Sequence, residues 1–195
     1  MARWAPDARG RLELAAMELF GEHGYESTTV AAIAERAGLT ERTFFRYYAD
    51  KREVLFWGAR ALQDVLVDRV DHAPADLSAI EAVTAALAAA GDEIFVGRHG
   101  YAGRRQAVID ANPELQEREL IKLARLAAAL ADALRRRGVG DPAADLAAEA
   151  GIAVFRVAFG SWIHGGGDRT LSDYILESSD ELRDVTGGRG RLRPD

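Results

Sequence analysis

Hydrophobic residues recur every three or four positions along nearly the whole chain, and the strict alternation typical of β-strands is absent from the sequence. Alanine, leucine, glutamate and arginine, which favour helices, dominate the composition. The sequence therefore predicts an all-α protein. The expected helices cover residues 7–23, a short segment after Thr29, another after Thr40, and then 50–71, 77–96, 101–111, 112–138, 141–164 and 171–185.

Polar residues and glycine mark the ends of the predicted helices. Thr29 and Thr40 are each placed to act as an N-cap, and Gly38 supplies a sharp turn between the two short helices. Asp141-Pro142 reads as a cap followed by a proline in the first helical position. These signals place a helix-turn-helix near the N-terminus and a long apolar helix near the C-terminus.

A domain boundary is expected near the start of the helix at 50–71, which opens with a capping signal, Asp50 followed by Glu53. Residues 1–52 would form an N-terminal three-helix domain, and residues 53–186 a larger helical domain. The helix at 50–71 would join the two mechanically. Residues 187–195, GGRGRLRPD, are expected to form a disordered tail.

The segment from Thr29 to Lys51 has the features needed to place a helix in the major groove of DNA. Gly38 and the small residues Ala34 and Ala37 allow two helices to cross steeply at a tight turn. Polar residues near the start of the second helix would face base edges, and their neighbours would bind phosphate. The segment therefore indicates binding to double-stranded DNA.

This segment resembles the signature of the tetracycline-repressor (TetR) family of bacterial transcription regulators. The resemblance covers residues 11–55 and rests on Thr28-Thr29, Ile33-Ala34, Ala37-Gly38, Thr43-Phe44-Phe45, Tyr47-Tyr48 and Lys51. It implies a ligand-binding and dimerisation domain after the DNA-binding domain. It also implies a repressor, rather than an activator or an enzyme, that a small-molecule effector releases from its operator.

The resemblance also implies which residues contact DNA. Phosphate contacts are expected from Thr28 or Thr29, Thr40, Tyr47 and Lys51, and base-edge contacts from Arg42 and Thr43, with Phe45 and Arg46 alongside. Phe45 stands where many members carry tyrosine, so a hydroxyl contact is lost. Core packing and contact with a thymine methyl group are both open for Phe45, whereas Phe44 and Tyr48 are expected in the core.

The position of Lys51 in the first turn of a predicted helix also indicates a phosphate contact. A cation in the first turn of a helix opposes the helix dipole, and a phosphate held between this lysine and the helix N-terminus would reverse that effect. The alternative is an ordinary solvated lysine. The surrounding arginines and tyrosines favour the phosphate contact.

The predicted helix at 141–164 is apolar on almost all sides. Between residues 146 and 163 only Glu149 and Arg156 are charged, so one side is expected to face its own domain and the other a second subunit. The last two helices would form a homodimer interface, as the resemblance also implies. Two recognition helices about 34 Å apart would then fit a palindromic operator. Glu149 and Arg156 would form an ion pair at the dimer edge or, alternatively, anchor a ligand.

A pocket for the effector is expected in the larger domain. Its candidate lining residues are Trp57, Phe95, His99, Tyr101, Arg105, Phe155, Phe159 and Trp162. Each aromatic residue alone is more often a core residue than a ligand contact. Ligand binding would shift the population of conformations through the helix at 50–71, with a coupling of about 1–3 kcal/mol.

The bulk composition narrows the class of protein further. The net charge of −6 argues against indiscriminate nucleic-acid binding, although four cations fall within residues 42–52. The chain has no cysteine, no signal-peptide pattern and no apolar run of membrane-spanning length. A cytoplasmic protein with no cofactor, metal site or membrane partner is therefore expected.

Two other classes of protein are weighed against a regulator. An all-helical enzyme is disfavoured, because the four histidines are dispersed and no H-E-x-x-H, G-x-S-x-G or phosphate-loop motif occurs. A helical scaffold whose helix-turn-helix no longer reads DNA is the second alternative. Salt-dependent DNA binding would distinguish a regulator from such a scaffold.

Overall fold

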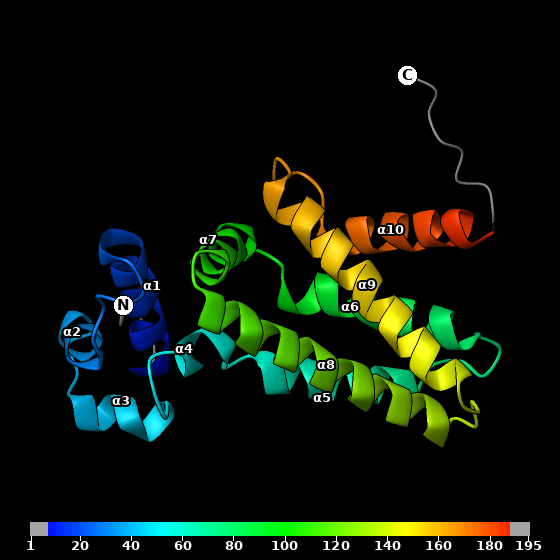
Figure 1. Cartoon of the computed structure of the whole chain (residues 1–195), viewed down its shortest axis with the longest axis horizontal. Helices are drawn as coiled ribbons and strands as arrows, with labels where there is room; N and C mark the ends of the chain where they lie inside the picture. The colour runs from blue at the N-terminus through cyan, green and yellow to red at the C-terminus, as the bar shows by residue number, and fades with distance from the viewer. Residues whose placement is uncertain (1–7, 188–195) are drawn as a thin grey trace, which may run out of the picture. The chain divides into compact units, whose positions relative to one another are not determined.

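The computed structural model of the protein describes residues 8–187, and within that range all regular structure is helical (Figure 1). This confirms the predicted all-α fold. The tail predicted at 187–195 lies, beyond Gly187, outside the described residues. The helices are α1 (Ala8–His23), α2 (Val30–Arg36), α3 (Glu41–Tyr47), α4 (Glu53–Phe56), α5 (Ala59–Asp71), α6 (Ala79–Ile94), α7 (His99–Asp110), α8 (Pro113–Arg136), α9 (Ala143–His164) and α10 (Leu171–Thr186).

The start signals of the two short N-terminal helices are confirmed. Thr29 Oγ1 accepts the backbone N–H of Ala32 at 3.1 Å, and Thr40 Oγ1 accepts that of Thr43 at 3.2 Å. Gly38 lies between α2 and α3 with φ of +65°, a left-handed conformation that glycine adopts without steric cost. Local side-chain chemistry therefore sets both helix starts and the turn between them.

The prediction of one continuous helix over 50–71 is wrong. Asp50 Oδ1 accepts the backbone N–H groups of Arg52 at 2.8 Å and Glu53 at 3.2 Å, so a turn precedes α4 and the helix begins only at Glu53. After Phe56 the helix is interrupted at residues 57–58, and α5 starts at Ala59. Gly58 lies at this break, and glycine destabilises the interior of a helix.

The predicted cap of α9 is also wrong in detail. The carboxylate of Asp141 accepts hydrogen bonds from Arg135 at 2.8 and 2.9 Å instead of capping the helix. Pro142 occupies the N-cap position rather than the first helical position, and α9 begins at Ala143. An ion pair with the end of the preceding helix has replaced the expected local cap.

The chain divides into two compact units. The first unit contains residues up to 59 together with 101–119, and the second contains residues 60–100 and those from 120 onward. This division differs from the boundary expected after residue 52, because residues 101–119 belong with the N-terminal helices. In the first unit, buried residues of α1, α2, α3 and α4 share one hydrophobic core with Ile109 and Leu115.

Three helices, α6, α9 and α10, pack against one another in the second unit. Within residues 8–187, α9 alone is long and apolar enough to cross a membrane, but 44% of its apolar stretch is buried in the protein. Its buried residues include Ile152, Phe155 and Trp162. These buried residues belong to the packing of α9 within the second unit.

Candidate nucleic-acid interface

Helix α3 is fixed in place by one buried face. Phe44 of α3 and Ile33 of α2 are both 0% exposed and belong to the core of the first unit. The Phe44 ring lies 5.4 Å, centroid to centroid, from that of Tyr48, which is also buried. The expected core positions of Phe44 and Tyr48 are confirmed, and the opposite face of α3 is thereby held toward solvent.

The exposed face of α3 carries two arginines and an aromatic ring. Arg42 forms no ion pair with any residue in the range 8–187. Arg46 donates a hydrogen bond to the Tyr47 hydroxyl at 3.3 Å and lies 5.0 Å from the centre of the Tyr47 ring. Phe45 is 54% exposed, so of the two possibilities for this side chain the structure favours the surface.

The two acidic residues that follow α3 in the sequence are paired with other cations. Asp50 forms an ion pair with Arg52 at 2.6 Å, and Glu53 forms one with Arg118 at 3.3 Å. Glu41 remains on α3 itself, in the first turn, where a negative charge suits the helix dipole. The positive charges of Arg42 and Arg46 are therefore less compensated than the net charge of −6 suggests.

Arg9 is a candidate contact residue that the sequence did not reveal. Its guanidinium carbon lies 5.4 Å from the centre of the Tyr47 ring and 4.1 Å from that of Trp57. The position of Arg9 beside Tyr47 depends on packing between segments far apart in the sequence, so no local pattern marks it. Trp57, predicted in the effector pocket, lies instead under Arg9 and is 44% exposed.

The structure separates the two threonines proposed for phosphate binding. Thr28 is 3% exposed, and its hydroxyl donates toward the carbonyl oxygens of Gly24 at 2.8 Å and Leu19 at 3.3 Å. Thr28 is therefore a core residue that fastens the α1–α2 loop. Thr29 is exposed at the N-cap of α2 and remains the candidate of the pair.

Lys51 is engaged in contacts inside the first unit. Its ammonium group donates to the carbonyl oxygens of Tyr25 at 2.7 Å and of Glu26 and Thr28 at 3.1 Å. It also lies 4.3 Å from the centre of the Tyr25 ring. The three donors of the ammonium are thus engaged by the α1–α2 loop, so the structure favours a structural role for Lys51 over the expected phosphate contact.

Replacing Lys51 by alanine is expected to lower the free energy of unfolding by about 1–3 kcal/mol, because three carbonyl oxygens lose a charged donor. Chemical denaturation measures this change. The matched variant is Arg52→Ala, whose side chain is exposed and pairs with the half-exposed Asp50, and we expect it to cost less than about 1 kcal/mol. An unchanged stability, together with a salt dependence of DNA binding reduced by about one ion, would instead assign Lys51 to phosphate.

Tyr25 and Tyr48 stay neutral in the core of the first unit. Burial raises the pKa of both phenols well above the ordinary value for tyrosine. Nearby carboxylates raise it further, Glu114 for Tyr25 and Glu13 for Tyr48. Tyr48 donates its hydroxyl hydrogen bond to Glu13 at 3.0 Å, which ties the end of α3 to α1.

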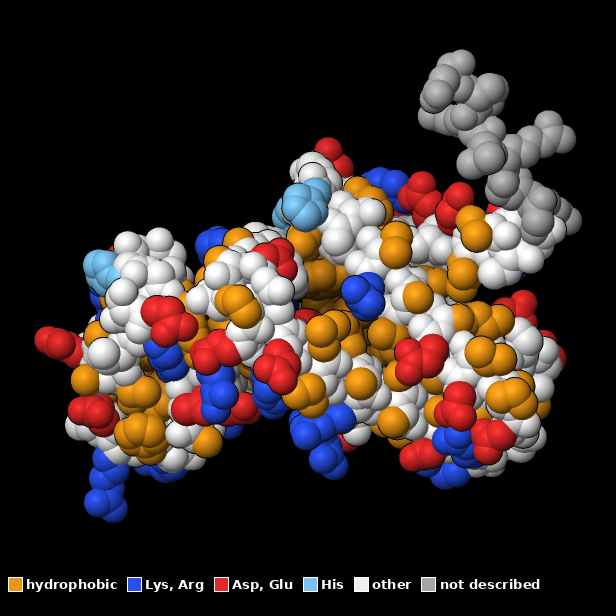
Figure 2. Space-filling model, in the orientation of Figure 1, with side chains coloured by type: hydrophobic (Ala, Val, Ile, Leu, Met, Phe, Trp, Pro, Cys, Tyr) orange, Lys and Arg blue, Asp and Glu red, His pale blue; other side chains and the backbone are white. Residues whose placement is uncertain are grey.

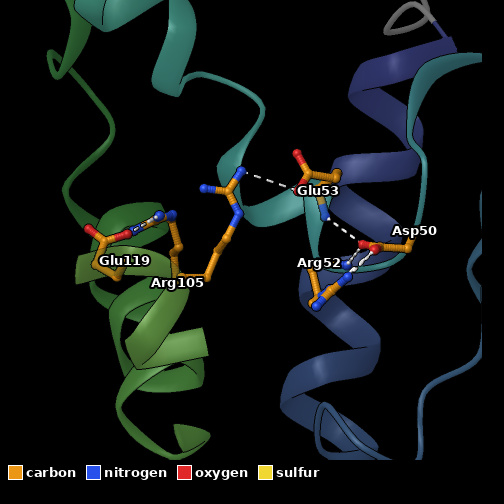
Figure 3. Close-up of polar contacts among 6 residues, drawn as sticks. Asp50, Arg52, Glu53, Arg105 and Glu119 are labelled. Atoms are coloured by element: carbon orange, nitrogen blue, oxygen red, sulfur yellow. Dashed lines mark hydrogen bonds and ion pairs between the residues drawn. The ribbon is translucent and has the colours of Figure 1, made fainter. Parts of the chain in front are cut away.

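Two arginines hold α4 within the first unit (Figure 3). Arg105 of α7 donates to the carbonyl oxygen of Leu55 at 2.7 Å and to Glu119 at 3.0 Å, and Arg118 of α8 pairs with Glu53 at 3.3 Å. Both guanidinium groups lie about 5 Å from the centre of the buried Phe56 ring. Arg105, predicted in the effector pocket, thus fastens α4 to α7 and the first turns of α8.

Five of the eight predicted pocket residues come together in the second unit. The Phe95 ring lies within 6.4 Å, centroid to centroid, of the rings of Phe155, Phe159 and Trp162. His99 Nε2 donates to the carbonyl oxygen of Trp162 at 2.9 Å. The other three residues belong to the first unit, where Tyr101 packs against the core.

Comparison with known proteins agrees with this geometry. Residues 14–56 match the family model for bacterial regulatory proteins of the tetR family, and residues 60–187 match the model of the MftR C-terminal domain. The chain is 30% identical over 180 residues to a protein of Mycobacterium tuberculosis described as the mycofactocin biosynthesis transcriptional regulator MftR. That match covers 91% of this chain and 88% of the relative.

Solved structures show the same fold. A TetR-family transcriptional regulator from Syntrophomonas wolfei superposes with a TM-score of 0.66 at 15% identity, covering 97% of this chain and 98% of that one. The regulator FadR of Bacillus subtilis, solved with stearoyl-CoA, has a TM-score of 0.60 at 19% identity and covers 89% and 96%. At these identities the likeness concerns the fold alone.

Proposed function

Since the chain belongs to the TetR family of bacterial transcription regulators, we propose that it is a repressor that binds a palindromic operator as a homodimer. A small-molecule effector releases it from DNA. The exposed face of α3 is the observation that carries the proposal. There Arg42 and Arg46 stand without an acidic partner among the described residues, on a helix that buried Phe44 and the Thr40 cap hold in place.

The residues of the DNA contact divide by their position on α3. Arg42 and Thr43 lie near the N-terminus of the helix, where a recognition helix meets base edges. Thr29, Thr40, Arg46 and Tyr47 flank them and offer hydroxyl and guanidinium groups to phosphate. Arg9 joins this second set, because its guanidinium lies beside the Tyr47 ring.

A homodimer is supported by the exposed side of α9. Leu146 and Val157 are more than 60% exposed on a helix whose other side packs against α6 and α10. Exposed apolar surface of this kind marks protein contacts, and a twofold dimer places two recognition helices on two half-sites. The dimer contact extends to α10, where Leu176 is 51% exposed.

The effector site is assigned to the aromatic cluster around Phe95, Phe159 and Trp162 in the second unit. Two regulators of the same fold were solved with lauroyl-CoA and stearoyl-CoA. Acyl-CoA thioesters are therefore the first compounds to test.

The arginine contacts to α4 form part of the route by which effector binding is proposed to change the position of α3, since Arg105 and Arg118 connect α4 with α7 and α8.

The remaining expectations follow from family membership. The relatives are described as transcription regulators, which supports a cytoplasmic protein without catalytic activity. Repression is preferred to activation because the effector-released repressor is the behaviour that the family resemblance implies.

Selection of genomic fragments by the purified protein tests the proposal. We expect a short palindrome to be recovered, with affinity falling steeply as salt rises, because neutralised phosphates release counterions. Fluorescence anisotropy on the selected fragment at several salt concentrations measures both properties. Absence of any selected fragment, or binding that does not depend on salt, would favour a helical scaffold that does not read DNA.

A further inference from the structure

One side of α9 exposes a stripe of small and apolar residues. Leu146 is 67% exposed and Val157 is 62% exposed, with exposed Ala153 and half-buried Gly160 on the same side. Over α9, Figure 2 shows a mainly hydrophobic and uncharged surface with isolated charged side chains. The small residue Ala153, in the middle of the stripe, allows a second helix to approach closely.

Two opposite charges stand on one flank of this stripe. Glu149 and Arg156 are both exposed, and neither forms an ion pair or a side-chain hydrogen bond with any residue in the range 8–187. They are seven residues apart, which is about two helical turns or roughly 10.5 Å along the axis. Elsewhere on α9, Asp145 is already paired with Arg135 at 2.7 Å.

The order of these charges is self-complementary under a twofold axis. When α9 packs antiparallel to its copy around a point between Ile152 and Ala153, residues equally far from that point face each other. Glu149 then faces Arg156 of the partner subunit, and Arg156 faces Glu149 of the partner subunit. A twofold axis keeps both pairs on the same flank, because symmetry maps each flank of the helix onto itself.

Helix α10 is a poor alternative for the position at the axis. Its exposed residues include the acidic Asp173, Glu177, Asp180 and Glu181, with Arg183 as the one cation of the helix. Contact between two copies of this face would oppose like charges, which costs affinity. The charge distribution therefore favours α9 at the axis and α10 to the side.

We propose that Glu149 and Arg156 form two reciprocal ion pairs across the twofold axis and select a second copy of this chain as partner. The proposal rests on the homodimer of the proposed function and adds the register and the selectivity of its interface. The apolar stripe supplies the affinity. The charge pair rejects related chains that lack the complementary order, because an unmatched charge is left opposite a like charge.

Charge reversals test the pairing. Glu149→Arg alone, or Arg156→Glu alone, is expected to weaken self-association about a hundredfold, because like charges then meet twice. The double variant Glu149→Arg/Arg156→Glu restores both pairs in the opposite order and should recover the homodimer. An equimolar mixture of the two single variants should form a heterodimer, since each doubly basic pair then meets a doubly acidic one.

Native mass spectrometry with one variant carrying a mass tag separates homodimers from heterodimers. Asp76→Arg, an exposed reversal outside α9 with the same change in net charge as Glu149→Arg, should leave self-association unchanged. Circular dichroism checks that every variant is folded. The pairing is overturned when the single variants dimerise as well as the wild type, or when neither the double variant nor the mixture recovers the dimer.

Failure of this pairing is distinguishable from failure of the proposed function. A wild-type protein that dimerises and binds its selected palindrome, but is indifferent to the reversals, refutes the pairing alone. A wild-type protein that neither dimerises nor selects DNA refutes the regulator itself.

Discussion

Replacing both Arg42 and Arg46 by alanine is expected to lower operator affinity at least about a hundredfold while leaving the fold intact. Each arginine that reaches a base edge or a phosphate contributes roughly 1–3 kcal/mol, and both side chains are exposed. Their loss removes no buried contact, so the stability of the first unit should be unchanged. Fluorescence anisotropy on the selected operator gives the affinity, and thermal denaturation checks the fold.

Arg36→Ala provides the matched control. Arg36 is a cation of the same small unit, but its guanidinium pairs with Glu22 at 2.8 Å and Glu18 at 3.4 Å. Its charge is largely neutralised within the protein. We therefore expect the affinity for the operator to change less than about threefold, because an exposed ion pair contributes little free energy. An equal loss in the Arg36 variant and in the Arg42/Arg46 double variant would show that general positive charge, and not the exposed face of α3, governs binding. No loss with Arg42 and Arg46 replaced would exclude α3 as the reading helix.

The parts of this fold that the sequence predicts are those set by local chemistry. The Thr29 and Thr40 caps involve a side chain and a backbone group three residues apart, and the turn at Gly38 needs a left-handed conformation that glycine tolerates. Such interactions can be predicted from the sequence because both partners lie in the same short segment. The core positions of Phe44 and Tyr48 were predictable because two aromatic residues four positions apart lie on one face of a helix.

The parts that the sequence does not predict depend on partners far away along the chain. Lys51 donates to carbonyl groups 23 to 26 residues earlier, and Arg105 donates to Leu55, 50 residues earlier. A backbone carbonyl carries no sequence signal, so neither contact could be inferred from residue types. The break between α4 and α5 was missed because the apolar pattern continues across Gly58.

Ion pairs near α3 also change what the net charge implies about affinity for DNA. The two acidic residues that follow α3 in the sequence are held in ion pairs, Asp50 with Arg52 and Glu53 with Arg118. The cations of α3 are left to act on DNA, and affinity for DNA depends on this local arrangement more than on the sum of −6.

Gly151→Ala is expected to lower the free energy of unfolding by about 1–3 kcal/mol, the usual cost of overpacking a close-packed core. A Cβ atom on Gly151 of α9 would lie 2.3 Å from Val83 Cγ1 and 3.4 Å from Val83 Cβ on α6. Val83 is 0% exposed and has a short, stiff side chain. The two helices would therefore have to move apart. Chemical denaturation at a fixed protomer concentration measures the change, because dimerisation contributes to apparent stability.

Gly103→Ala is the matched control, since a Cβ at this mid-helix glycine of α7 meets no atom within 4 Å. It should be neutral or stabilise the protein by about 0.5–1 kcal/mol, the ordinary gain of alanine over glycine in a helix. Val83→Ala should then be less damaging in the Gly151→Ala background than alone, because the new methyl group fills part of the space that the valine leaves. Independent, additive effects of the two substitutions, or a Gly151→Ala protein as stable as the wild type, would show that α6 and α9 do not meet at this glycine.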